Sequence, residues 1–388
     1  MTTEPVLLPA SAGAAPRARD LGVPFRGQPG RHGAITDVPG VEVGCVTLIE
    51  GEGERAVRTG VTAILPRGRG GVGDACAAAV HSFNGNGELT GRSWIDEAGA
   101  LTLPVAITSS HAVGAVHSGV EAWVARHAPE VAAEWMLPVV GETWDGYLHD
   151  INGGHVRPEH AEAALDAATG GAVPEGNVGG GTGMNCYGFK GGTGTSSRVV
   201  PIGDERYAVG VLVQANFGAR EELELAGIRI GAGSAAPNRM ETEDWLRRDG
   251  ERLRSRPGAG SAIVVIATDA PLLPGQCAAL ARRGPLGLAR SGTAGGHFSG
   301  DIMLAFSTAN SGALASRLPG EEPVAHERLR ILPWGRIDPL LTAVVQAVDE
   351  AVWNALIAAE DMTGRSGHFS PALPHEEVRA AVARLAAR

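Results

Sequence analysis

The stretch Ser255-Arg256-Pro257-Gly258-Ala259-Gly260-Ser261 runs directly into residues 262–267, which read Ala-Ile-Val-Val-Ile-Ala. The first part has the glycine and proline content of a polar loop, and the second is an apolar, β-branched run typical of a buried strand. The hydroxyl of Ser261 therefore stands where a loop is predicted to enter a rigid core. If the Gly260–Ser261 peptide bond were broken, the freed α-amine, with an ordinary pKa of about 8, could act as the base for that hydroxyl. A Gly-Ser pair before a strand is also an ordinary loop end, so the rest of the chain has to decide.

Composition narrows the classes of protein to consider. The 388 residues are 44% hydrophobic, which is enough for one large domain or two smaller ones. The formal net charge of −10, without a Lys/Arg cluster, argues against a nucleic-acid partner. Four scattered cysteines without metal-type spacing predict reduced thiols, no metal site and a cytoplasmic protein. No export signal and no run of about 18 apolar residues is evident, so no membrane partner is expected.

The order of predicted elements favours a layered α/β fold with sheets inside and helices outside. The N-terminal residues 1–30 are rich in Ala, Pro and Gly and are expected to form a flexible arm, with residues 31–388 as a single domain. Residues 35–44, in which alternating valines are split by Pro39-Gly40, predict a strand, a turn and a second strand. The other strands are predicted at residues 61–65, 105–108, 207–216, 262–267 and 301–308, and the helices at residues 118–127, 157–169, 276–283, 338–360 and 376–387.

Glycine is unusually frequent, with 56 residues in all, and it is densest between residues 176 and 198. Gly183 to Lys190 comes close to the spacing of a phosphate-binding loop, but Phe189 stands where the lysine should be. A non-catalytic phosphate or nucleotide binder is therefore only a secondary hypothesis. Lys190 itself is either a surface lysine or an ammonium that stabilises negative charge near a reacting carbonyl.

Three polar residues stand at strand ends. Ser299 and Asp301 are two residues apart at a predicted strand start, so their side chains point the same way and could together hold an amine or a hydroxyl. Asn216 closes the strand before Phe217-Gly218, where a carboxamide could donate to an oxyanion. The alternative for each position is a turn that the side chain caps.

Three further residues suggest less specific chemistry. His111 follows a predicted strand, and a Ser/His/Asp triad is imaginable, but no Gly-x-Ser-x-Gly motif precedes a candidate serine. Glu142 and Asp145 lie in a polar loop, where they could receive a substrate ammonium or be ordinary loop acids.

Five longer segments, in this order along the chain, resemble the DmpA-type aminopeptidases, a family that includes β-peptidyl aminopeptidases and nylon-oligomer hydrolases. The resemblance extends from about Ile35 to Gly364. The segments that carry it are residues 181–184 (Gly-Thr-Gly-Met), 189–198 (Phe-Lys-Gly-Gly to Ser-Ser-Arg), 213–218 (Val-Gln-Ala-Asn-Phe-Gly), 267–272 (Ala-Thr-Asp-Ala-Pro-Leu) and 299–310 (Ser-Gly-Asp to Thr-Ala-Asn).

The resemblance implies an αββα sandwich similar to that of N-terminal-nucleophile hydrolases, with the connectivity shared by this family and the ornithine acetyltransferases. It implies self-cleavage between Gly260 and Ser261 into an α fragment of residues 1–260 and a β fragment of residues 261–388. It also implies a homo-oligomer, expected as a tetramer of αβ heterodimers, and no cofactor.

The same resemblance assigns roles to individual residues. Ser261 matches the nucleophile that forms an acyl-enzyme, and Asn216 matches an oxyanion-hole donor. Lys190 matches a lysine near the nucleophile. Ser299 and Asp301 match the residues that position the amine and hydroxyl of the nucleophile.

The substrate side of the site is implied in the same way. Glu142 matches the carboxylate that holds the free amino group of a small peptide, amino-acid amide or ester. Trp144 stands where the family commonly has tyrosine, and an indole donates a hydrogen bond but cannot accept one. Ser261 and Ser299 favour the aminopeptidase branch over the nylon-oligomer branch, and an endo-acting amide hydrolase or an acyltransferase on the same scaffold stays open.

Overall fold

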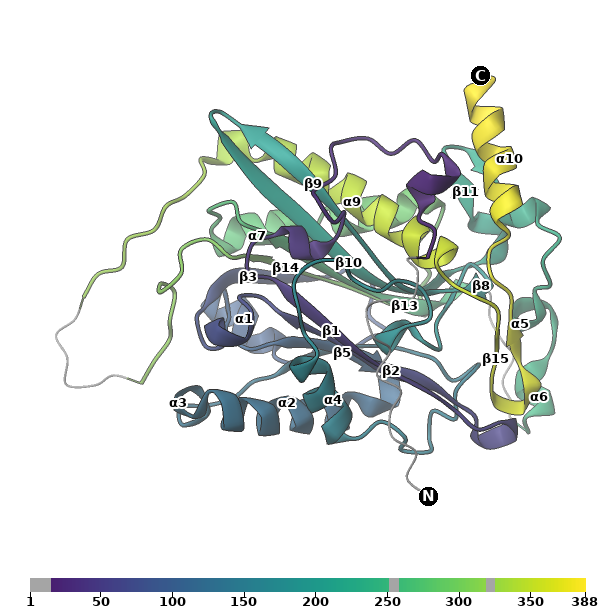
Figure 1. The fold of residues 1–388 in the computed structure, drawn as a ribbon, viewed down its shortest axis with the longest axis horizontal. Helices are drawn as coiled ribbons and strands as arrows, with labels where there is room; N and C mark the ends of the chain where they lie inside the picture. The colour runs from purple at the N-terminus through teal and green to yellow at the C-terminus, as the bar shows by residue number, and fades with distance from the viewer. Residues whose placement is uncertain (1–14, 251–257, 319–324) are drawn as a thin grey trace.

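Two β-sheets face each other at the centre of the computed structural model, which describes residues 15–250, 258–318 and 325–388. One layer of helices covers the outer face of each sheet, so the order of layers is helices, sheet, sheet, helices (Figure 1). The predicted αββα sandwich is therefore confirmed.

The larger sheet has six strands in the order β4-β3-β14-β13-β10-β9. The central pair, β13 and β14, is parallel, and all other pairs in this sheet are antiparallel. The strand that carries Ser261 is therefore hydrogen-bonded on both sides. The strands are β3 (Cys76–Ser82), β4 (Ala100–Leu101), β9 (Gly192–Ile202), β10 (Glu205–Gly218), β13 (Gly258–Thr268) and β14 (Ser299–Ser307).

The smaller sheet has four strands in the order β1-β2-β5-β6, and its last pair is parallel. Three short strand pairs, β7–β8, β11–β12 and β15–β16, lie outside both sheets. The four strands are β1 (Glu42–Glu50), β2 (Val57–Leu65), β5 (Val105–Ser109) and β6 (Val139–Thr143), and the short ones are β7 (Asn185–Cys186), β8 (Phe189–Lys190), β11 (Glu224–Leu225), β12 (Ile228–Arg229), β15 (Met362–Thr363) and β16 (Phe369–Ser370).

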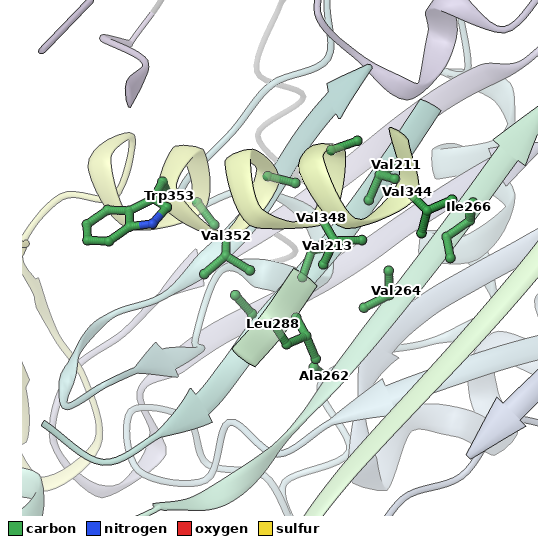
Figure 2. Packing of buried hydrophobic residues seen from close by; sticks show 14 of the residues in the cluster. Val211, Val213, Ala262, Val264, Ile266, Leu288, Val344, Val348, Val352 and Trp353 are labelled. Carbon is green, nitrogen blue, oxygen red and sulfur yellow. The ribbon is translucent and has the colours of Figure 1, made fainter. Parts of the chain in front are cut away.

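Alternation along β13 divides its side chains between two cores. Ala262, Val264 and Ile266 pack under helix α9 (Asp338–Ile357; Figure 2), in a core that also contains Val344 and Val348. Ile263, Val265 and Ala267 belong instead to the core between the two sheets. Because side chains alternate with a period of two, that of Ser261 lies on the inter-sheet face.

The helices cover the two outer faces. Helices α7 (Pro274–Ala281), α8 (Gly284–Leu288) and α9 (Asp338–Ile357) lie over the six-stranded sheet, and α2 (Val113–His127) and α4 (Pro158–Asp166) lie over the four-stranded sheet. Helix α9 is long and apolar enough to cross a membrane, but 72% of its apolar window is buried, as in the core helix of a soluble domain. The remaining helices are α1 (Arg92–Ala98), α3 (Pro129–Ala132), α5 (Arg239–Thr242), α6 (Trp245–Arg248) and α10 (His375–Ala386).

The glycine-rich centre is a region of close packing. A Cβ atom on Gly180 would lie 2.2 Å from Oε1 of Gln214, and one on Gly194 would lie 2.0 Å from the carbonyl oxygen of Ala351. Residues 179–198 are all buried. These glycines therefore allow the strands and helix α9 to approach one another closely. Close packing accounts for the high frequency of glycine in this region, and no phosphate-binding loop is needed to explain it.

The structure differs from the sequence predictions at three places. Strand β13 begins at Gly258, so the Gly260–Ser261 bond lies within a strand and not at a loop end. Residues 35–37 form a 3₁₀ helix where a strand was predicted. Residues 15–30 were expected in a loose arm, yet Ala18 and Leu21 are buried. Residues 1–14 of that arm and residues 251–257 of the predicted loop lie outside the described residues.

Candidate active site

Ser261 is buried, with 2% of its surface exposed, near the start of β13. It lies opposite Asn216 of the antiparallel strand β10 and opposite Gly300 of the parallel strand β14. Its Oγ accepts a hydrogen bond from the backbone N–H of Trp144, with a distance of 3.4 Å between the two heavy atoms. Trp144 directly follows β6, so the nucleophile candidate contacts a backbone donor from the other sheet.

Asn216 links three segments of the chain. Its Nδ2 donates to the carbonyl oxygen of Trp144 at 2.9 Å, and its Oδ1 accepts from the N–H of Asn185 at 2.8 Å. The carboxamide is 4% exposed, so these contacts fix its orientation next to Ser261. The hydroxyl thus accepts from the Trp144 backbone, and the Asn216 amide lies on the strand directly opposite it. The Trp144 donor is a backbone group, so it does not depend on the identity of the side chain.

Ser299 and Asp301 approach from β14. The Ser299 hydroxyl donates to Oδ1 of Asp301 at 2.7 Å, as their shared face predicted. Their cross-strand neighbours are Gly260 and Ala262, which flank Ser261. Burial raises the pKa of the Asp301 carboxyl, while hydrogen bonds from Ser299, Asn84 and the Ala262 N–H act in the opposite direction.

The two sides of the larger sheet separate these groups. Ile302 and Leu304 of β14 belong to the inter-sheet core, whereas Met303 and Ala305 belong to the core under α9. By alternation, Ser299 and Asp301 lie on the α9 side, and the Ser261 hydroxyl lies on the inter-sheet side. The pair therefore lies on the opposite face from the Ser261 hydroxyl, and the Asp301 carboxylate accepts from the backbone N–H of Ala262, the next residue of β13.

Asn84 is a member of this cluster that the sequence analysis missed. Its Nδ2 donates to Oδ2 of Asp301 at 2.7 Å, and its Oδ1 accepts from the backbone N–H of Asp301 at 2.6 Å. The sequence Asn84-Gly85-Asn86-Gly87 signals only a turn. Nothing in that signal indicates which carboxylate the turn meets, because Asp301 is more than 200 residues away.

Lys190 is fully buried in β8 and was expected either at the surface or near the reacting groups. Its Nζ donates to the carbonyl oxygens of Met184 at 2.7 Å, of Gly191 at 2.8 Å and of Gly181 at 3.4 Å. Burial lowers its pKa to about 7, although the charge of Asp145 acts to raise it. The carbonyl cage holds the ammonium, and β7, the pairing partner of β8, carries the Asn185 N–H that fixes Asn216.

Glu142 and Asp145 differ sharply in their surroundings. Glu142, at the end of β6, accepts from the N–H of Glu88 at 2.9 Å and from the Ser110 hydroxyl, and burial raises its pKa. Asp145 is completely buried, accepts from the Ser109 hydroxyl at 2.7 Å, and has a pKa raised by burial to about 7. Asp145 is therefore not the acid that a substrate ammonium meets, and Glu142 is the better candidate.

The indole of Trp144 packs against a small cluster of buried residues that includes Tyr147 and Trp245. The ring packs near Trp245 of α6, with centroids 6.2 Å apart, and Trp245 in turn contacts Tyr147 edge to face. The packing of these three aromatic rings holds the segment that follows β6, which includes the Trp144 N–H.

Two other features lie outside the cluster. The exposed His111 pairs with Oδ1 of Asn152 at 2.8 Å, so the imagined Ser/His/Asp triad does not form at Ser261. A cavity of about 130 Å³ lies near the opposite end of β3 and is lined in part by Trp94 and Trp135. Among the described residues, no group of three or more His, Cys, Asp or Glu side chains could hold a metal ion.

Comparison with known proteins gives the family. The model of peptidase family S58 matches residues 33–370. The beta-peptidyl aminopeptidase BapA of Sphingosinicella microcystinivorans is 47% identical over 382 residues, which cover 97% of this chain and 94% of that protein.

Solved structures agree with the observed layers. A beta-aminopeptidase from Burkholderia sp. superposes with a TM-score of 0.86 at 44% identity, covering 96% of this chain and all of that one. The L-aminopeptidase D-Ala-esterase/amidase of Ochrobactrum anthropi, described as a prototype serine aminopeptidase and a variant of the Ntn-hydrolase fold, also gives 0.86, at 43% identity and 96% and 99% coverage. The chain therefore belongs to peptidase family S58 and is a serine aminopeptidase of the N-terminal-nucleophile type.

Proposed function

We propose that the chain cleaves itself between Gly260 and Ser261, and that the new N-terminal serine then removes N-terminal residues from small peptides, amino-acid amides or esters. The observation that carries this proposal is the placement of the Ser261 hydroxyl, which accepts from the Trp144 N–H and lies directly opposite Asn216. On the other side of β13, the Ser299–Asp301 pair lies next to Gly260 and Ala262, the two residues that flank Ser261. An amine freed at Ser261 would therefore belong to the residue between these two groups.

Maturation starts with attack of the Ser261 Oγ on the carbonyl carbon of Gly260. The C–N bond breaks as the nitrogen takes a proton, which leaves an ester, and water hydrolyses that ester to a carboxylate. Glycine at position 260 fits the crowded strand, because a Cβ atom there would lie 2.0 Å from the carbonyl oxygen of Asn216.

In catalysis, the α-amine of Ser261 accepts the hydroxyl proton as Oγ attacks the substrate carbonyl. The oxyanion that forms lies within reach of the Trp144 N–H and the Asn216 amide, and such donors stabilise the transition state. The protonated amine then gives its proton to the leaving amine or alcohol. Water hydrolyses the resulting acyl-enzyme by the same route in reverse.

Glu142 supplies the preference for a free N-terminus. Its carboxylate is buried near the Ser261 site and is held by the Glu88 N–H and the Ser110 hydroxyl. A substrate ammonium that pairs with it replaces lost hydration, whereas a blocked N-terminus leaves a buried carboxylate unpaired. The beta-peptidyl name of the relative makes substrates with an N-terminal β-amino acid a first choice for assay.

The test is the mass of the purified protein under denaturing conditions, together with hydrolysis of aminoacyl p-nitroanilides with α- and β-amino acids. Two fragments, residues 1–260 and 261–388, are expected, with Ser261 as a new N-terminus. Ser261→Ala should stay one chain and lose activity, whereas Ser261→Cys keeps a nucleophile and controls for folding. An intact wild-type chain that still hydrolyses these substrates would overturn the proposal.

The same assay separates the alternatives on this scaffold. Transfer of the acyl group to an added amine would indicate an acyltransferase, and cleavage inside a long amide oligomer would indicate an endo-acting hydrolase. We also propose that the cleaved heterodimer forms a homo-oligomer, whose mass size-exclusion chromatography with light scattering measures directly. We further propose that the protein is cytoplasmic, which fractionation of the cells tests.

A further inference from the structure

A six-residue turn joins the two halves of the site. Residues 83–88 follow strand β3 and run from Asp301 to Glu142: Asn84 contacts the first carboxylate, and the Glu88 N–H contacts the second. In between, the N–H of Asn86 donates to the carbonyl oxygen of Ser299 at 3.2 Å. This turn therefore touches the groups proposed to orient the base as well as the group proposed to bind the substrate ammonium.

The turn packs closely against β14 where Gly87 meets Gly300. A Cβ atom on Gly87 would lie 2.9 Å from Cα of Gly300, and one on Gly300 would lie 2.3 Å from the carbonyl oxygen of Asn86. Gly300 is the cross-strand neighbour of Ser261. Only glycine at both positions allows this approach, so the turn has a fixed height above the nucleophile strand.

Asn84 grips Asp301 at two points. Its amide nitrogen donates to Oδ2 at 2.7 Å and its amide oxygen accepts the Asp301 backbone N–H at 2.6 Å. The other carboxylate oxygen, Oδ1, accepts the Ser299 hydroxyl. Both oxygens are therefore engaged, which fixes the orientation of the carboxylate, and it also accepts from the Ala262 N–H of the neighbouring strand β13.

We propose that Asn84 is a positioning residue for the reaction: it holds the Asp301 carboxylate ionised and oriented toward the α-amine of Ser261. The inference rests on the proposed role of that amine. Asn84 touches neither the reacting atoms nor the substrate, so its effect passes through Asp301. Removing its N–H donor makes the ionised carboxylate less favourable, and the acid limb of the kcat profile then moves to higher pH.

The experiment compares three variants with the wild type in kcat, KM and the pH dependence of kcat. Asn84→Ala should lower kcat roughly ten- to hundred-fold, since one hydrogen bond to a charged group is lost, with little change in KM. Asn84→Asp preserves shape and still accepts the Asp301 N–H, but it replaces the donor by a second carboxylate. Its acid limb should therefore move further than that of Asn84→Ala.

The matched control is Asn86→Ala, from the same turn. The Asn86 side chain donates to a backbone carbonyl, that of Phe298, at 2.9 Å and not to a carboxylate. It should leave the acid limb in place. The inference would be overturned if the acid limb of kcat moved equally in all three variants. It would also be overturned if Asn84→Ala and Asn84→Asp were processed normally and had the kcat and pH dependence of the wild type. Lack of processing in the wild type would instead overturn the proposed function.

Discussion

Asn216 and Ser261 lie directly opposite each other across strands β10 and β13, and both side chains contact the backbone of Trp144. One side chain accepts its N–H, and the other donates to its carbonyl oxygen. A residue that follows the four-stranded sheet is thus held against two strands of the six-stranded sheet. The position of the proposed oxyanion donors therefore depends on how the two sheets pack.

Replacing Asn216 by alanine should therefore lower kcat by about 100- to 1,000-fold, the usual effect of removing one oxyanion donor. The change also frees the Trp144 carbonyl and the Asn185 N–H. Gln214→Ala is the matched control, because Gln214 lies on the same strand and contacts Thr108 and Thr143. It should lower thermal stability with a much smaller effect on kcat, and similar losses of kcat in both variants would contradict the oxyanion role.

Replacing Glu142 by glutamine should reduce kcat/KM for substrates with a free amine by roughly ten- to hundred-fold, since a charged hydrogen bond is lost. Activity on N-acetylated analogues should change little. An equal loss of kcat/KM for substrates with free and with acetylated N-termini would show that Glu142 does not bind the substrate ammonium.

The pH dependence of binding gives an independent check on Glu142. Its folded pKa is raised above the ordinary 4.5, so ammonium binding is lost as pH falls through that higher value. The charge of Glu88 contributes to the rise. Glu88→Gln should therefore move the acid limb of kcat/KM to lower pH, and a limb that moves upward would contradict the assignment.

Asp145 should make the protein less stable in alkaline solution. Its folded pKa of about 7 lies above the ordinary 3.8, so its contribution is fully present below pH 4 and is lost as pH rises through 7. Asp145→Asn removes this ionisation without changing shape. The gap in melting temperature between pH 5 and pH 8 should shrink in the variant, measured by calorimetry, and an unchanged gap would count against a protonated Asp145.

A methyl group on Gly194 should disrupt the contact between β9 and helix α9. Its Cβ would lie 2.0 Å from the carbonyl oxygen of Ala351 and 2.7 Å from the N atom of Ala355. Gly194→Ala is expected to lower the free energy of unfolding by about 1–3 kcal/mol or more. Gly233→Ala, at a position with no atom within 4 Å, is the control and should cost far less in chemical denaturation.

The local sequence contained most of the fold because its apolar runs are long and unambiguous. The strand around residues 207–216 and the helix from Asp338 were located within a few residues. The start of β13 was not, because Gly258-Ala259-Gly260 has the composition of a loop. Pairing with β10 and β14 on both sides outweighs that local preference, which no short window can reveal.

The candidate site was predictable only where a motif or a resemblance marked it. Ser299 and Asp301 share a face by simple alternation, and their hydrogen bond follows. The cage around Lys190 and the grip of Asn84 on Asp301 depend on contacts between distant segments. Such contacts form only when the sheets pack together, so the spacing of residues along the chain cannot predict them.

The strand order of the larger sheet has a consequence for the two pieces that a cut at residue 260 would create. Strands β13 and β14, which belong almost entirely to the later piece, are inserted between β3 and β10 of the earlier one. The pieces are thus interleaved along two hydrogen-bonded seams, and dilution alone would not part them. Produced apart, each piece would expose unpaired strand edges and be prone to aggregate, so a cut made after folding would leave the two pieces already assembled.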